Sequence, residues 1–124
     1  MSIKASCHCR VTQFEVSKAP TSVTECNCTF CFKQGALWAY YSLEQVIFTK
    51  NDRTTIYTRD ESTHKHHHCS VCGCTAYNEV LCTWDDKTFE PDFTKPQIAV
   101  NARLFDDFDL AAVRVRQVDG RNLW

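Results

Sequence analysis

Seven of the nine cysteines in this 124-residue sequence fall into two sets with metal-ligand spacing. The first set joins a Cys-x-Cys pair to a distant Cys-x-x-Cys pair and supplies four thiolates, from Cys7, Cys9, Cys69 and Cys72. The second set has the spacing Cys-x-Cys-x-x-Cys and supplies three, from Cys26, Cys28 and Cys31. A zinc ion with four thiolate ligands usually stabilises a fold, whereas one with three protein ligands keeps a position for water or substrate. The sequence therefore predicts a closed, structural zinc site and an open, catalytic one.

The closed site requires tight turns that direct backbone N–H groups at the sulfur atoms. Gly73 follows the Cys-x-x-Cys pair and suits such a turn, because glycine adopts positive φ without steric cost. Arg10 has the equivalent position after Cys9, where it either distorts the turn or offsets thiolate charge with its guanidinium. Buried free thiols are the alternative to a metal at this site. A bound ion would contribute on the order of several kcal/mol to folding.

The open site favours sulfur chemistry. Three thiolates around Zn²⁺ leave a net negative complex, which ionises water poorly and prefers a soft fourth ligand such as an incoming thiol. This predicts formation or cleavage of a carbon–sulfur bond, with zinc holding the thiol and a nearby group moving the proton. Alternatively the site is empty or oxidised, or a protein side chain closes it. The side chains available for closure belong to Cys74, Cys82, His64, His66, His67 and His68.

Composition excludes several classes of partner. The formal net charge is −1, the sequence pI is near 6.5, and the 14 Lys and Arg residues are scattered, which argues against nucleic acid and against a zinc ribbon that binds it. No segment approaches the ~18 consecutive apolar residues of a membrane span, and no apolar run opens the chain. Nine cysteines without a secretion signal favour reduced thiols over disulfides. We therefore expect a soluble, cytoplasmic protein whose oligomeric state the sequence leaves open.

The elements around these cysteines are predicted to be short strands. Polar or turn-forming residues separate them, and helical periodicity is rare, so we expect one mostly β domain over residues 1–124. The predicted strands cover residues 11–16, 36–41, 46–48, 54–58, 75–83 and 97–104. Ser42 and Gln45 have capping-box spacing and predict one helical turn. Residues 105–112 are expected to form a short turn or helix, and residues 85–96 a surface loop.

Other residues near the cysteines have two interpretations each. On a strand, His66 and His68 would share one face and His67 the other, so at most part of the histidine run serves one site, with polar packing as the simpler reading. The aromatic side chains after the open site either wall a pocket or belong to the core: Trp38, Tyr40 and Tyr41. A substrate carboxylate, or simply solvent, is the partner expected for Lys33, Arg59 and Arg103. Turn capping is the simpler role for the acids at Asp106, Asp107 and Asp109.

Four longer strings extend the two cysteine patterns: SCHC at 6–9, CNCTFCFKQGALW at 26–38, CSVCG at 69–73 and VNARLFD at 100–106. In this order they resemble the glutathione-dependent formaldehyde-activating enzyme family, which includes centromere protein V. The tail DLAAVRVRQVDG at 109–120 is also similar to the closing segment of that family. Against the family pattern, Arg10 replaces a glycine, His68 replaces an aromatic residue, and Cys74 and Cys82 are additions.

The resemblance implies a fold of several coiled antiparallel β-sheets, as in small zinc-binding Rab-exchange proteins. It also implies one structural zinc on the four-cysteine set and one functional zinc on the three-cysteine set. The family's activity implies a carbon–sulfur lyase that interconverts S-hydroxymethylglutathione with glutathione and formaldehyde, so the expected partner is a small thiol such as glutathione. The alternative is a non-catalytic zinc module that binds a protein, for which both metal sites would be closed.

Overall fold

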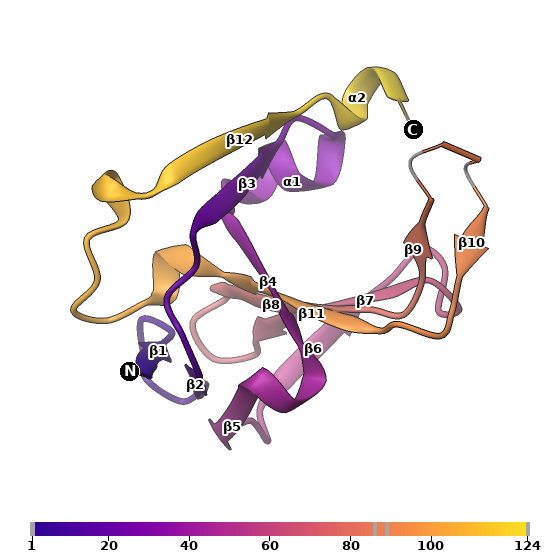
Figure 1. Ribbon diagram of the computed structural model, residues 1–124. Helices are drawn as coiled ribbons and strands as arrows, with labels where there is room; N and C mark the ends of the chain where they lie inside the picture. Colours follow the sequence, from indigo (N-terminus) through magenta and orange to yellow (C-terminus); the bar gives the residue numbers. More distant parts are fainter. Residues whose placement is uncertain (1, 86, 89, 124) are drawn as a thin grey trace.

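The computed structural model describes residues 2–85, 87–88 and 90–123, and its strands form three sheets (Figure 1). The largest sheet has seven strands among these residues, in the order β12 (Arg114–Val118), β3 (Ser22–Cys26), β4 (Trp38–Ser42), β11 (Gln97–Asn101), β8 (Thr75–Val80), β7 (His64–Cys69) and β6 (Thr54–Tyr57). A second sheet contains β1 (Ile3–Ser6), β2 (Gln13–Val16) and β5 (Val46–Lys50). The third pairs β9 (Thr83–Trp84) with β10 (Pro91–Asp92).

Short helices connect and flank the strands. They are α1 (Thr29–Gln34), α2 (Gly120–Leu123) and three 3₁₀ turns, η1 (Leu43–Gln45), η2 (Ala102–Leu104) and η3 (Leu110–Ala112). The predicted capping box at η1 is confirmed, because the Ser42 N–H donates to Gln45 Oε1 at 2.9 Å. No helix within the described ranges is long and apolar enough to cross a membrane.

The expectation of a mostly β fold with several sheets is confirmed, with one difference in strand direction. Among the described pairings, β12 and β3 run parallel and the others run antiparallel. Each predicted strand overlaps an observed one, but 46–48 was predicted too short, β4 extends one residue beyond the predicted 36–41, and two strands were predicted too long. Of the predicted strand 97–104, the observed β11 ends at Asn101 because η2 follows it. Of the predicted strand 75–83, the observed β8 ends at Val80. Within residues 85–96, the expected loop, β10 pairs with β9; residues 86 and 89 lie outside the described residues.

The large sheet separates two apolar clusters, and this separation positions the three-cysteine set. Along β4, Ala39 and Tyr41 face the main core, which also contains Phe14 and Val100. Trp38 faces the opposite side, in a smaller cluster with Ala36 and Ala99, against which Phe30 and Cys31 of the α1 segment pack. Strand alternation therefore places α1 and the three-cysteine set on the side of the sheet away from the main core.

Asn101 joins the elements around α1 from a buried position. Its Oδ1 accepts the N–H groups of Leu37 at 3.4 Å and Arg103 at 3.2 Å, and its Nδ2 donates to the Thr75 carbonyl at 3.0 Å. The side chain is 6% exposed, so these groups have little access to water as replacement partners. Asn101 thus ties the α1–β4 connection, β8 and η2 together.

We predict that Asn101→Ala lowers the free energy of unfolding by about 2–4 kcal/mol, because it leaves buried backbone groups without partners. Urea denaturation of the metal-loaded protein measures this. Asn122→Ala, at an exposed position, is the control and should change stability by less than about 0.5 kcal/mol. Equal losses for both variants would contradict the role assigned to Asn101.

Candidate metal centres

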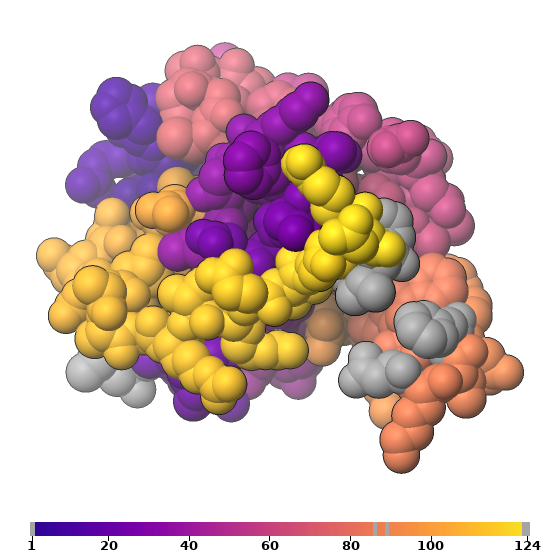
Figure 2. All heavy atoms as spheres, turned by 90° about the horizontal axis from the view of Figure 1, so that it is seen from above, coloured from indigo at the N-terminus to yellow at the C-terminus, as the bar shows by residue number. Residues whose placement is uncertain are grey.

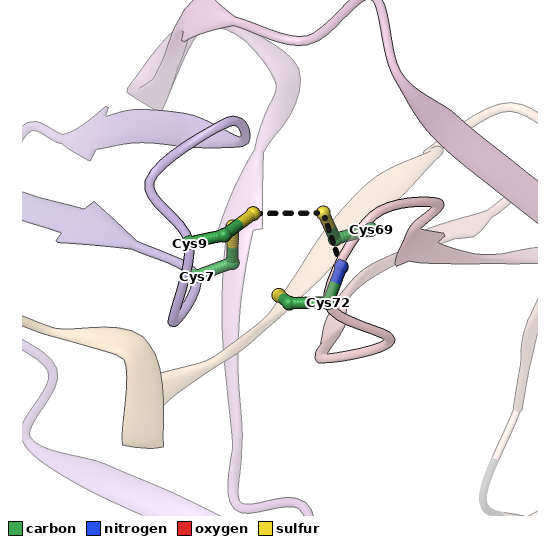
Figure 3. Close-up of side chains that lie close together, drawn as sticks. All are labelled: Cys7, Cys9, Cys69 and Cys72. Carbon is green, nitrogen blue, oxygen red and sulfur yellow. Dashed lines mark hydrogen bonds between the residues drawn. The ribbon is translucent and has the colours of Figure 1, made fainter.

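The four-cysteine set converges as predicted. The sulfur atoms of Cys7, Cys9, Cys69 and Cys72 lie within 4.8 Å of one another and face a common point (Figure 3). The Cys9 sulfur is 3.6 Å from that of Cys7 and 3.6 Å from that of Cys69. One pair follows β1 of the three-stranded sheet, and the other begins at the end of β7 of the seven-stranded sheet. This tetrad therefore joins two sheets.

Backbone N–H groups point at the tetrad sulfurs. Thr12 donates to Cys7 Sγ at 3.3 Å, while Val71 and Cys72 donate to Cys69 Sγ at 3.4 and 3.5 Å. Burial raises the pKa of the Cys72 thiol, but hydrogen bonds from the backbone of Cys74 and Cys9 and from neighbouring sulfurs outweigh it and lower the pKa to about 5. At Cys69 burial is likewise outweighed by the N–H groups of Cys72 and Val71, so its pKa is lowered, whereas at Cys9 the Val11 N–H is outweighed by burial and the neighbouring sulfurs and the pKa rises to about 12. Because the thiolate is the metal-binding form, the surroundings of Cys69 and Cys72 favour a cation.

Arg10 adopts the glycine-like backbone conformation that its position requires. Its φ is +66°, compared with +82° at Gly73, and its N–H donates to the Cys7 carbonyl at 3.0 Å just as the Gly73 N–H donates to the Cys69 carbonyl at 2.9 Å. The turn after Cys9 therefore keeps its shape, and the cost is a non-glycine residue in the left-handed region.

We predict that Arg10→Gly raises the free energy of unfolding by about 0.5–1 kcal/mol through relief of this conformation. Gly73→Ala is the matched opposite change and should cost about 1 kcal/mol; its new Cβ would meet no atom within 4 Å, so backbone strain alone decides the result. Denaturation at fixed zinc concentration measures both. A destabilised Arg10→Gly variant would show that the guanidinium itself supports the tetrad.

The three-cysteine set also converges, with its sulfurs within 4.8 Å of one another. Cys26 ends β3, Cys28 is the N-cap of α1, and Cys31 lies inside α1. The Cys28 N–H donates to Cys26 Sγ at 3.4 Å and the Cys31 N–H donates to Cys28 Sγ at 3.4 Å. The indole N–H of Trp38 donates to Cys31 Sγ at 3.3 Å. Each sulfur of this trio therefore accepts one N–H hydrogen bond.

The trio sulfurs differ in acidity. Burial raises the pKa of Cys31, although the Trp38 indole opposes the increase. At Cys28 the effect of burial is outweighed by the Cys31 N–H and the neighbouring sulfurs, so its pKa is lowered. Burial, together with the nearby Cys31 and Cys26 sulfurs, raises the pKa of Tyr40 to about 12. Burial also raises the pKa of Cys26. Cys28 is therefore the trio thiol whose surroundings favour the thiolate, and a metal ion would have to displace the protons of Cys26 and Cys31.

The alternative that a protein side chain closes the trio finds no support in the described part of the chain. There, no fourth ligand atom from His, Cys, Asp or Glu joins the three sulfurs within 4.8 Å. His67, one candidate, is buried on the core side and bonds Glu79 at 2.6 Å and Thr54 at 3.1 Å. Cys82, another, is buried and donates to the Thr83 carbonyl at 3.5 Å.

The model of the glutathione-dependent formaldehyde-activating enzyme family matches residues 2–113. The chain belongs to this family. A crystal structure of a Rhodobacter sphaeroides protein has a similar fold, with a TM-score of 0.67 and 23% sequence identity over 91% of this chain and 99% of that one. No curated protein matched.

Around the trio of this family member, the histidine run lies on β7, and its faces alternate as predicted for His66 and His67. The His66 ring stacks on Phe30 with 3.8 Å between centroids, and its Nδ1 lies 2.8 Å from Asn78 Oδ1. His67 instead stacks on Tyr77 at 4.3 Å. A register shift between His67 and His68 interrupts the pairing with β8. The run therefore contributes polar packing, with His66 on the α1 side.

Other residues singled out in the sequence divide between packing and surface. Trp38 and Tyr41 are buried, as the core interpretation predicts, and Tyr40 is 48% exposed. Asp109 caps η3 through the Ala111 N–H at 3.2 Å, as the turn interpretation predicts. Arg103 donates from Nε to the Gly35 carbonyl at 2.8 Å, at the end of α1. Lys33 and Arg59 are exposed.

Sequence reasoning missed the Trp38 hydrogen bond, although Trp38 stands only seven residues after Cys31. We predict that Trp38→Phe weakens metal binding at the trio roughly 10- to 100-fold, because it removes the N–H donor to a ligand sulfur and keeps an aromatic ring. Competition with a chromophoric zinc chelator measures the affinity.

The matched control is Tyr41→Phe, on the same strand, which removes the hydroxyl that donates to the Lys18 carbonyl at 2.9 Å. It should leave the affinity of the trio unchanged. Trio affinities that are equal in the Trp38→Phe variant and the wild type would rule out a role for the indole N–H.

Proposed function

We propose that this protein is a zinc-dependent carbon–sulfur lyase that acts on the S-hydroxymethyl adduct of glutathione or of a related small thiol. The observation that carries the proposal is the difference between the two centres. The trio brings three sulfurs together with no fourth protein ligand in the described residues, whereas the tetrad brings four. Membership of the formaldehyde-activating family supports the choice of substrate.

In this proposal the tetrad holds a structural zinc ion through Cys7, Cys9, Cys69 and Cys72. It connects the three-stranded sheet to the seven-stranded sheet, so its role is stability. The trio of Cys26, Cys28 and Cys31 holds the second, functional zinc ion, and these three residues are the proposed catalytic ligands. The donor sets fit this assignment, since zinc prefers thiolate ligands in a compact tetrahedral arrangement.

A zinc ion bound by the trio would act as a Lewis acid that keeps a thiol ionised at neutral pH. In the proposed reaction the carbon–sulfur bond of the adduct breaks and its electron pair stays on sulfur. The hydroxyl proton passes to water as the carbonyl of formaldehyde forms, so the products are thiolate, proton and aldehyde. The reverse reaction forms the adduct.

The chain's own residues keep the trio sulfurs fixed during such a reaction. Backbone N–H groups from the Cys28 and Cys31 positions and the indole of Trp38 hold one sulfur each. Preorganised donors of this kind need no rearrangement when charge develops on sulfur. The nine free cysteines agree with a reducing compartment, and we place the protein in the cytoplasm as a single domain without a nucleic-acid partner.

We predict that Cys28→Ser lowers the metal content from two ions per chain to one and preserves the fold, because the tetrad remains intact. In the cobalt-substituted wild type, glutathione should change the visible absorption spectrum, since a thiolate replaces a weaker ligand. That change should disappear in the variant. Metal analysis and absorption spectroscopy measure both effects.

Cys72→Ser is the comparison variant and should give insoluble or molten protein, because it breaks the tetrad. A Cys28→Ser protein that retains two metals would contradict the proposal. So would a wild-type spectrum indifferent to glutathione, which is the result expected of a zinc module that only binds a protein partner.

A further inference from the structure

The C-terminal segment docks on the residue between the first two trio cysteines. β12 pairs in parallel with β3, and the register places Val118 opposite Cys26. Arg121 of α2 lies over the ring of Phe32, the residue after Cys31, with its Cζ 5.4 Å from the ring centroid. The C-terminal segment, yellow in Figure 2, lies against violet atoms from the first third of the chain, and Figure 1 shows α2 beside α1.

Every hydrogen-bonding group of Asn27 is used in this contact. Its backbone N–H donates to the Val118 carbonyl at 3.1 Å, and its carbonyl accepts Arg121 Nε at 3.1 Å. Its Oδ1 accepts the Arg121 backbone N–H at 2.9 Å, and its Nδ2 donates to Asp119 Oδ1 at 2.9 Å. We call these four hydrogen bonds the Asn27 clamp.

β12 buries little apolar surface where it pairs with β3, so apolar burial alone does not explain its position at this edge of the sheet. Its first four residues are exposed and only Val118 is partly buried. Within this segment, Asn122 Nδ2 donates to both Asp119 carboxylate oxygens. Beyond the strand pairing, the hydrogen bonds from Val118, Asp119 and Arg121 to other described parts of the chain end on Asn27. The segment also lies outside residues 2–113, the part matched by the family model. The specific contact of the segment is thus with the loop that carries two trio sulfurs.

We infer that Asn27, Asp119 and Arg121 are positioning residues that hold the Cys26 and Cys28 sulfurs in the arrangement that binds the second metal. The clamp fixes Asn27 from both its backbone and its side chain, and Cys26 and Cys28 are its direct neighbours. Arg121 also contacts Phe32 of α1, the residue after Cys31. The C-terminal segment therefore contacts the chain beside the first and the last cysteine of the trio. Residues that orient metal ligands in this way typically change affinity 10- to 100-fold when mutated.

The test measures metal affinity in the full chain rather than activity, so it rests on the proposed function only for the identity of the site. Asn27→Ala should weaken zinc binding at the trio about 10- to 100-fold in chelator competition and leave the tetrad affinity unchanged. Cadmium-113 NMR of the substituted protein should keep the signal of the four-sulfur site and lose or broaden that of the three-sulfur site. Arg59→Ala, at an exposed position outside the C-terminal segment and the trio loop, is the control.

A charge exchange separates positioning from general destabilisation. Asn27→Asp alone sets two carboxylates against each other at Asp119 and should weaken the trio site at least as much as Asn27→Ala. The double variant Asn27→Asp with Asp119→Asn restores the donor–acceptor pair and should recover affinity to within about threefold of wild type. If Asn27→Ala does not fold, Arg121→Ala at an exposed position should still cost several-fold in trio affinity.

Wild-type trio affinity in Asn27→Ala, or in Arg121→Ala, would overturn the inference. So would a double variant no better than Asn27→Asp. These outcomes are independent of glutathione binding. If the variants behave as predicted but glutathione leaves the cobalt spectrum unchanged, the role of the Asn27 clamp stands and the proposed reaction is wrong.

Discussion

The convergence of four sulfur atoms from two distant parts of the chain is the constraint on which the rest of the structure depends. Cys7 and Cys9 follow the first strand, Cys69 ends β7 and Cys72 follows it, and the sulfurs meet within 4.8 Å. Four thiolates this close repel one another strongly unless a cation lies between them, while backbone N–H groups offset only part of the charge. Once they are joined, the three-stranded and seven-stranded sheets are fixed relative to each other, and the main core lies between them.

The trio uses the same local chemistry with one ligand fewer. In both centres, backbone N–H groups point at sulfur and a residue with positive φ ends the turn or helix, Gly73 in one and Gly35 in the other. The difference lies in what stands opposite. The second Cys pair completes the tetrad, whereas the trio is contacted by Trp38, which donates to Cys31 Sγ, and by the C-terminal segment, which bonds Asn27. In the proposed account, stability and reactivity therefore come from the same motif with different coordination.

The cysteine groupings and the capping box could be predicted from the sequence, because each depends on spacing within a few residues. At Arg10 the sequence left open a distorted turn or a charge-offsetting guanidinium, and the structure shows an undistorted turn. The elements that were missed depend on partners far away. No residue of α1 is fully buried and β12 is mostly exposed, so neither element has a periodic apolar pattern in the sequence. The Trp38 and Asn27 contacts were missed because they join residues brought together by sheet pairing, and the parallel β12–β3 pairing has no local sequence signal.

Zinc K-edge X-ray absorption with and without glutathione tests the central claim most directly, because it counts sulfur neighbours at the metal. The account predicts an average of fewer than four sulfurs per zinc in the thiol-free protein and a rise to four when glutathione is added. An average of four sulfurs before any thiol is added, unchanged afterwards, would show that both centres are closed by the protein and would contradict the division into one structural and one reactive site.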